Sequence, residues 1–200
     1  MGIFLGDKGK LNFLILTVIV SVILTTIEIV EAFVRLNKDE VVVYDFNGGL
    51  AIDLRSGHEA HLFTDADSTQ RTKLIDHLVS PDRLRSGLPN LEVGITEIDQ
   101  WVEVFDKIQL KELQGRKFIR IFSSDFLEAS FRKKIETDYL VISNNSAKNL
   151  GQILDRFEFN LLVIDGSNDY GNSYRIVKLA NDQGLVVHAT RFDGALILDL

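Results

Sequence analysis

Two polar clusters directly follow apolar runs in the last third of the chain. Ser143-Asn144-Asn145-Ser146 comes after the apolar residues 139–142, and Asp165-Gly166-Ser167-Asn168-Asp169 comes after residues 161–164. Binding and catalytic groups of α/β sheets gather at strand ends, so chemistry is expected here first. Asn, Ser, Asp and Gly are also ordinary turn and helix-cap residues. On residue types alone, this second interpretation is favoured.

Five aspartates extend this set of polar candidates. Their carboxylates could together hold a hard cation such as Mg²⁺, which prefers oxygen ligands. The five are Asp45, Asp65, Asp67, Asp165 and Asp169. The chain has no cysteine, which excludes disulfides, thiolate zinc sites and cysteine nucleophiles.

The four histidines suggest no metal site. His58 and His61 are three positions apart, so on a strand they point to opposite faces and cannot easily share one metal ion. His77 lies in a helical pattern and His188 near a strand end, each without an obvious partner. Neither His-Glu-x-x-His, a glycine-rich phosphate loop nor Gly-x-Ser-x-Gly occurs, so no known catalytic constellation emerges.

A layered scaffold is needed to position these polar residues. The pattern predicts a three-strand meander over residues 41–44, 50–54 and 58–64, then a helix over 69–79. Residues 80–100 contain Pro81 and Pro89 and are predicted to be a long loop. Alternating apolar and polar residues then predict strands over residues 101–105, 108–113 and 117–122.

The last third of the chain alternates between buried strands and helices. Strands are predicted over residues 139–142, 161–164, 185–188 and 195–198, with helices over 150–157 and 173–182. Continuous apolar strands that alternate with helices indicate a sheet covered on a face. The fold class expected is a layered α/β or α+β domain.

A membrane-spanning helix is predicted before this domain. Of residues 11–35, 17 of 25 are apolar, and no charge occurs between Lys10 and Glu28. Such a run, extended to Val34, is about 36 Å long as a helix and can cross a bilayer with some tilt. A cleaved signal peptide and a buried soluble helix are the alternatives. Lys8 and Lys10 mildly favour a cytoplasmic N-terminus.

The charge balance limits the possible partners. Lys and Arg number 22 against 29 Asp and Glu, a formal net charge of -7. This acidic balance argues against a broad phosphate-binding surface. Local basic runs, Arg132-Lys133-Lys134 and Arg83 with Arg85, could still contact phosphates, although a solvated face is the favoured interpretation.

Several short runs occur in a recognisable order. Asp45-Phe46-Asn47-Gly48-Gly49-Leu50-Ala51 and Phe63-Thr64-Asp65-Ala66 come first, and Ser143 to Lys148, Ile164 to Ser173 and Thr190 to Ile197 follow. This order resembles the C-terminal domain of the ComEC family of competence proteins, which has a metallo-β-lactamase-like fold. The family pattern at these positions is Asp-Val-Gly-Gln-Gly-Asp-Ala, Ile-Asp-Thr-Gly, His-His-Gly-Ser-Lys, Gly-Lys-Asn-Asn-Arg-Tyr-Gly-His-Pro and Thr-x-x-x-Gly-Ala-Ile.

The chain departs from this pattern at the metal-binding positions. The family's His-His pair falls on Asn144-Asn145 and its later histidine on Asn172. Residues 66–138 contain a single histidine, His77. An amide nitrogen has no available lone pair, and its oxygen is a weak ligand for zinc. The resemblance therefore implies a degenerate site without metal or cofactor, of a kind associated with Bacteroidetes-type ComEC proteins. Its possible residual polar residues are Asp45, Asp65, Asp165, Ser167 and Asn168.

The resemblance also implies an organisation and a setting. Residues 1–38 would be a cytoplasmic N-terminus and the last transmembrane helix of the channel, and residues 39–200 a degenerate metallo-β-lactamase-like αββα sandwich. The family imports single-stranded DNA across the bacterial inner membrane, so the domain would face the periplasm. The expected partners are the membrane, single-stranded DNA and the channel-forming part of the same transporter family. The chain itself would be a truncated or split product of such a transporter.

Three functions stay open at this point. The first is a non-catalytic domain of a DNA-uptake channel, and the second is a metal-dependent nuclease or other hydrolase with a rebuilt carboxylate site. The third is an inert, membrane-anchored interaction module.

Overall fold

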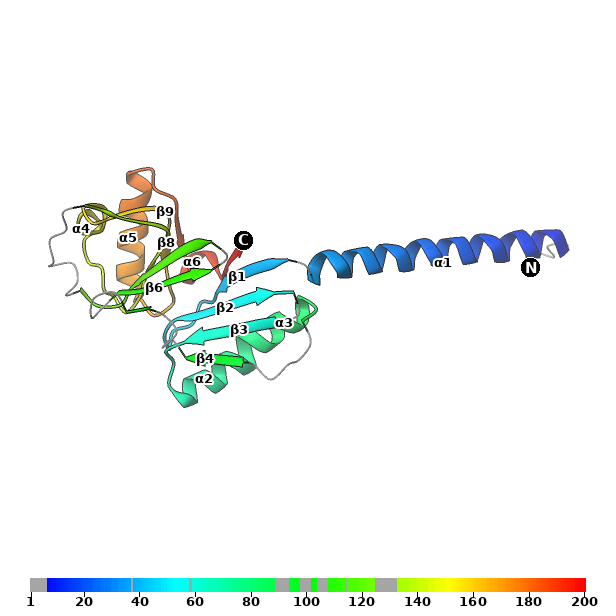
Figure 1. Cartoon of the computed structure of the whole chain (residues 1–200), viewed down its shortest axis with the longest axis horizontal. Helices are drawn as coiled ribbons and strands as arrows, with labels where there is room; N and C mark the ends of the chain where they lie inside the picture. Colours follow the sequence, from blue (N-terminus) through cyan, green and yellow to red (C-terminus); the bar gives the residue numbers. More distant parts are fainter. Residues whose placement is uncertain are drawn as a thin grey trace.

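The computed structural model describes residues 7–36, 38–57, 59–88, 94–97, 102–103, 108–113, 115–124 and 133–200. A long N-terminal helix leads into a domain built from two sheets and their covering helices (Figure 1). Predicted residues outside these ranges, among them His58, Pro89 and Arg132, lie outside the described part of the chain.

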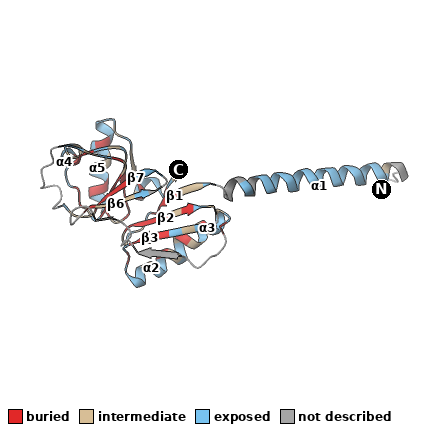
Figure 2. Ribbon diagram, in the orientation of Figure 1, coloured by how far each residue is buried: buried red, intermediate tan, exposed pale blue. Residues whose placement is uncertain are grey.

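Helix α1 (Asp7–Leu36) extends away from the domain. Within it, Gly9–Val30 is long and apolar enough to cross a membrane, and none of that stretch is buried against the rest of the chain. Figure 2 shows the helix as exposed along most of its length, with Gly9 near its start of intermediate exposure. Valine, isoleucine and threonine disfavour helix in water, but inside lipid only a helix or a closed barrel satisfies the backbone. The helix predicted over residues 11–35 is confirmed.

The first sheet has the strand order β11-β1-β2-β3-β4. Strands β1, β2 and β3 form the predicted antiparallel meander, β11 pairs antiparallel with β1, and β4 pairs parallel with β3. The strands are β1 (Asp39–Val43), β2 (Ala51–Ser56), β3 (Glu59–Thr64), β4 (Gly94–Glu97) and β11 (Leu196–Asp199).

The second sheet has the strand order β10-β9-β8-β7-β6-β5. Strands β7, β8, β9 and β10 are parallel to one another, and β5, β6 and β7 are antiparallel neighbours. The strands are β5 (Val102–Glu103), β6 (Ile108–Leu113), β7 (Arg116–Ile121), β8 (Ile135–Ile142), β9 (Phe157–Ile164) and β10 (Val187–Ala189).

Three apolar clusters show that the domain has four layers. Val41, Val43, Val141 and Val163 pack between the two sheets. The outer face of the first sheet packs on Leu74 and Val79 of its helices, and that of the second packs on helices α4 (Leu150–Leu154) and α5 (Tyr170–Asp182). Because strand side chains alternate, β1 and β8 contribute to clusters on both of their faces. The layered fold with an α-β-β-α order agrees with the prediction.

The prediction of a long loop over residues 80–100 was wrong at residues 80–85 and 94–97, while residues 89–93 and 98–100 lie outside the described part of the chain. Helix α2 (Ser68–Leu74) continues through a π-helical segment, η1 (Ile75–Val79), into α3 (Ser80–Arg85), and β4 follows. Pro81 stands in the first turn of α3, where the wider π-turn lets the Ser80 N–H bond to Ile75 O. A proline at such a position costs little, since it needs no intrahelical donor there.

The last third of the chain agrees with the predicted alternation, but three helices differ in detail. Helix α5 begins at Tyr170 rather than at residue 173. Helix α4 ends at Leu154 rather than at residue 157, because Phe157 begins β9 and is buried in the core. A short unpredicted helix, α6 (Thr190–Asp193), precedes β11. It spans four residues, too few for a helical period to be visible in the sequence.

Candidate functional site

Polar side chains extend the inward faces of three parallel strands beyond the apolar core. Phe118, Val141 and Val163 lie in the core between the sheets, and two positions further along their strands come Arg120, Ser143 and Asp165. Since side chains repeat every two residues, these three groups lie on the same faces as the core residues. The carboxyl ends of β7, β8 and β9 therefore bring them to one edge of the sheet.

Arg120 is the centre of this edge. It is 1% exposed; its Nε donates to Ser143 Oγ at 2.9 Å, and its guanidinium also donates to Gln109 Oε1 at 3.2 Å. Its remaining terminal nitrogen forms an ion pair with Asp65, which follows β3 of the other sheet. The guanidinium thus joins the two sheets at this end of the sandwich.

Asp165 is fully enclosed and accepts hydrogen bonds on both of its oxygens. The Ser143 hydroxyl donates to Oδ2. Oδ1 accepts from the Ser167 N–H at 3.0 Å, from the Ser167 hydroxyl and from Asn168 Nδ2 at 3.1 Å. Burial raises the pKa of Asp165, while Arg120 and the serine hydroxyls oppose that rise.

The two adjacent asparagines Asn144 and Asn145 make the turn after β8. Both have positive φ angles, 55° and 56°, a conformation in which asparagine is strongly enriched. The Asn144 N–H donates to Ser167 Oγ at 2.7 Å, and the Asn145 N–H donates to Asn168 Oδ1 at 2.9 Å. Asn145 Oδ1 in turn accepts from the Asp169 N–H at 2.9 Å. The two polar clusters are therefore bonded to each other as paired turns.

Asn172, the third asparagine that the family resemblance places at a metal-binding position, lies in the first turn of α5. Its side chain is largely buried, and its Oδ1 accepts from Arg175 at 2.7 Å. Its Nδ2 is enclosed and has no hydrogen-bond partner within the described part of the chain.

Asp45 reaches the same edge from the turn after β1. Its Oδ1 lies 3.5 Å from the Thr190 hydroxyl. The backbone at Phe46 packs so closely on Gly166 that a Cβ at Gly166 would lie 2.5 Å from Phe46 N. Arg191 of α6 also joins these two turns, since it donates to Gly166 O at 2.8 Å and to Asn47 Oδ1 at 3.0 Å.

The remaining two aspartates have capping roles. Asp67 accepts from the Gln70 N–H at 2.9 Å at the start of α2, and Asp169 accepts from the Asn172 N–H at 2.7 Å at the start of α5. Over the ranges that the structure describes, no three His, Cys, Asp or Glu side chains come together as a group that could hold a metal ion.

A shallow polar hollow opens above this edge. It has a volume of about 290 Å³. The lining residues are Asn47, Gly48, Gly49, Asp65, Gln70, Asn144 and Ser167. They include Asp65 and Ser167 of the predicted residual site, and Asn144, one of the asparagines that the resemblance places at metal-binding positions.

The family model of the ComEC C-terminal domain matches residues 41–200. The chain belongs to the ComEC family. No curated protein and no solved structure matches it. Membership associates the chain with competence DNA uptake and with a membrane DNA-transport setting. The N-terminal helix, which is apolar enough to span a bilayer, agrees with that setting.

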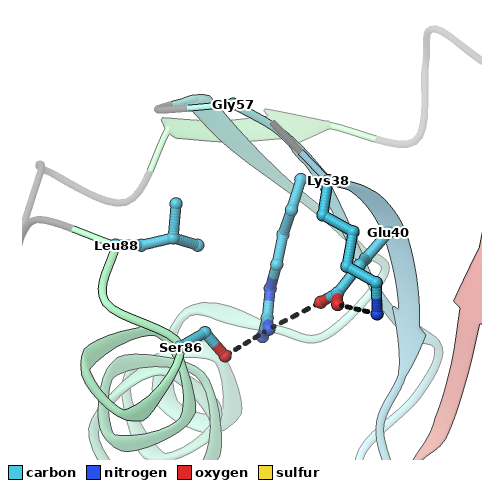
Figure 3. A pocket seen from close by; sticks show the side chains of 6 residues that line it. Lys38, Glu40, Gly57, Ser86 and Leu88 are labelled. Atoms are coloured by element: carbon cyan, nitrogen blue, oxygen red, sulfur yellow. Dashed lines mark hydrogen bonds and ion pairs between the residues drawn. The ribbon is translucent and has the colours of Figure 1, made fainter. Parts of the chain in front are cut away.

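A second cavity of this ComEC domain lies near the end of the first sheet that faces α1. It has a volume of about 140 Å³ and is lined by Lys38, Glu40, Arg55, Gly57, Ser86 and Leu88 (Figure 3). Arg55 donates to Ser86 Oγ at 3.0 Å and lies 3.7 Å from Glu40, which pairs with Lys38 at 3.0 Å. Its charged groups bind one another, so the cavity offers no uncompensated charge to a ligand.

Arg83 is buried, so both the solvated face that was favoured for it and the possible phosphate contact were wrong. Its guanidinium is buried against Asp53, which also binds Arg55 at 3.0 Å. Tyr44 lies in the same buried network, where burial and the neighbouring Asp53 raise its pKa. Only a charged pair on the apolar strand β2, Asp53 and Arg55 at alternate positions, indicates this network in the sequence.

Arg120 was likewise missed by sequence reasoning. The single charged side chain inside Phe118-Ile119-Arg120-Ile121 was its one indication, since a charge on an inward-facing strand position must be paired. The partner, Asp65, is 55 positions away in the sequence and follows a strand of the other sheet. No spacing pattern could have identified it.

Proposed function

We propose that this chain is a non-catalytic, extracytoplasmic domain of a ComEC-type DNA-uptake channel. One observation carries the proposal: an internal guanidinium, Arg120, occupies the charge-neutralising position at the strand ends where the family's metal site is expected. It pairs directly with Asp65 and, through the Ser143 hydroxyl, with Asp165.

A guanidinium can neutralise carboxylates but cannot replace a catalytic cation. A hydrolytic metal must be held by about three strong ligands and must keep a position open for water, whose pKa it lowers. A guanidinium such as that of Arg120 donates hydrogen bonds but offers no coordination position for a water molecule. Amides stand at Asn144, Asn145 and Asn172, and both oxygens of Asp165 already accept hydrogen bonds. The charged groups at this edge therefore neutralise one another, as they do in a structural ion-pair network.

The ancestry and topology form a second part of the proposal. The α-β-β-α order, with the polar clusters at the ends of β8 and β9, supports a degenerate metallo-β-lactamase-like domain. Helix α1 supports a single membrane span. Lys8 and Lys10 at the N-terminal end of that span favour a cytoplasmic N-terminus, which would place the domain in the periplasm at the bacterial inner membrane.

The test is a nuclease assay and a metal analysis on the full chain purified in detergent. Single-stranded DNA is incubated with Mg²⁺, Mn²⁺ or Zn²⁺, and the Asp165→Ala variant is the control. We expect both proteins to show the same background cleavage, and elemental analysis to find well below one transition metal ion per chain. Metal-dependent cleavage that Asp165→Ala abolishes would instead establish the rebuilt carboxylate nuclease.

A further inference from the structure

Three aromatic side chains lie together on the surface beside the Arg120 edge. Tyr170 is 64% exposed, Tyr174 is 58% exposed and Phe192 is 39% exposed. The two tyrosine rings are parallel within 3°, with centroids 6.5 Å apart, and Phe192 meets Tyr170 edge-on at 5.2 Å. We call these three residues the aromatic platform.

The platform is not a by-product of core packing. Tyr170 and Tyr174 are one turn apart on α5, on the exposed side of the helix, while Ile176 and Ala180 fill the core. Aromatic side chains normally bury a large apolar area, so a group of three on the surface indicates a contact surface. In the described part of the domain, the other exposed large apolar side chains are aliphatic: Leu84, Leu179, Val186 and Ile197.

Hydrogen bonds fix the platform to the Arg120 edge. Arg191, next to Phe192, donates to Gly166 O and Asn47 Oδ1. Asn145 Oδ1 accepts from the N–H of Asp169, which caps the helix that carries both tyrosines. The aromatic rings therefore lie at the margin of the proposed non-catalytic site.

We propose that the aromatic platform stacks on the bases of single-stranded DNA. The inference rests on the proposed function, which makes the chain part of a DNA-uptake system. Aromatic rings accept the face of any base, which suits uptake of DNA of any sequence. A role in stacking also agrees with the acidic composition, which disfavours extensive phosphate binding.

The charges around the platform are consistent with a strand held mainly by its bases. Arg175, Lys178 and Arg191 lie on the same two helices. The neighbouring carboxylates of Asp169 and Asp193 accept backbone hydrogen bonds from Asn172 N and Ala189 N. With few cations for phosphates, the affinity should depend only weakly on salt.

The experiment measures binding of a fluorescent oligothymidine to the full chain in lipid nanodiscs, by anisotropy. The Tyr170→Leu/Tyr174→Leu variant keeps apolar side chains but removes the aromatic faces, and Tyr170→Phe/Tyr174→Phe keeps the faces. We expect the leucine variant to bind about 5- to 150-fold more weakly for each stacked base lost, which corresponds to about 1–3 kcal/mol. The phenylalanine variant should bind within about twofold of the wild type.

Two controls distinguish base stacking from a general apolar contact and from phosphate binding. Val186→Ala removes an equally exposed apolar side chain of the same domain and should leave binding unchanged. An abasic oligonucleotide keeps the phosphates but lacks the bases, and should bind weakly to wild type and leucine variant alike. Both tyrosines are exposed, so the thermal midpoints of the variants should match that of the wild type and confirm folding.

The proposal is overturned if the wild type does not bind the oligonucleotide, or if the leucine and phenylalanine variants bind equally well. The second result would indicate a general apolar docking surface for a protein. Neither result affects the proposed absence of catalysis, because the nuclease and metal measurements decide that independently.

Discussion

At the scale of single residues, Arg120 connects side chains of both sheets within the candidate site. It compensates the charge of Asp65 and hydrogen bonds to Ser143, which binds the enclosed Asp165. A buried charge that loses its partner is left in a low-dielectric environment, which costs far more than a lost surface ion pair.

We therefore expect Arg120→Met to lower the free energy of unfolding by about 3 kcal/mol or more, measured by urea denaturation. Arg116→Met is the matched control on the same strand, since Arg116 is exposed and forms a loose ion pair with Asp138 at 3.6 Å. This substitution should lower the free energy of unfolding by less than about 1 kcal/mol. Equal losses for the two variants would contradict the role given to Arg120.

Asp165 gives a second prediction at this scale, on pH dependence. Burial raises its pKa in the folded state, so the folded chain takes up this proton at a higher pH than the unfolded chain does, where the pKa is about 3.9. The charged carboxylate therefore lowers stability at neutral pH, and this penalty disappears as the pH falls through the raised folded pKa.

Asp165→Asn cannot titrate and should lack this pH-dependent contribution. We expect the stability of the wild type relative to Asp165→Asn to increase as the pH is lowered from neutral toward about 4. Urea unfolding of both proteins across this range measures the difference. A stability difference that is constant, or that decreases on acidification, would show that burial does not dominate the titration of Asp165.

At the scale of elements, helix α5 depends on its first turn for both structure and position. Asp169 accepts the Asn172 N–H at 2.7 Å, and its own N–H binds Asn145 of the neighbouring turn. An N-cap carboxylate satisfies one unpaired backbone donor and interacts favourably with the helix dipole.

Asp169→Ala should lower the free energy of unfolding by about 1 kcal/mol. Asp182→Ala, at the other end of the same helix, should be neutral or slightly stabilising, because a carboxylate at a helix C-terminus opposes the dipole. Both aspartates are exposed, so urea unfolding compares capping and not burial. Similar effects for the two substitutions would contradict the capping role.

At the scale of the whole molecule, the chain combines a four-layer domain with a helix that nothing in the domain covers. None of Gly9–Val30 is buried against the domain, so the environment of this helix must be supplied from outside it. Lipid supplies such an environment, because it solvates an apolar helix whose backbone is internally bonded.

A lysine near the middle of the span should disrupt this interaction. Val20→Lys adds about 2.5–3.5 kcal/mol to the cost of insertion, so a larger share of the protein should be extracted from membranes by alkaline carbonate. Val186→Lys introduces the same charge at an exposed position of the domain and should leave the membrane fraction unchanged. If Val20→Lys stays fully in the membrane pellet, the prediction that a central lysine weakens insertion of this helix is wrong.

The strands and the apolar N-terminal helix could be predicted because their information is local. The apolar runs at residues 41–44, 139–142 and 161–164 overlap β1, β8 and β9, since only a buried strand needs so many consecutive apolar residues. Local patterns failed at Pro81, where a π-turn lets the helix continue past a residue that usually ends one.

Residue types and short spacings were enough to predict the polar clusters at the strand ends, whereas only the family resemblance assigned Asn144, Asn145 and Asn172 to metal-binding positions. The partners of those clusters follow from the folded arrangement instead. Arg120 and Asp65 meet because two sheets stack face to face, and Tyr170 meets Phe192 because α6 packs beside α5. Such pairs join positions far apart in the chain, and packing alone sets which side chains then share an edge.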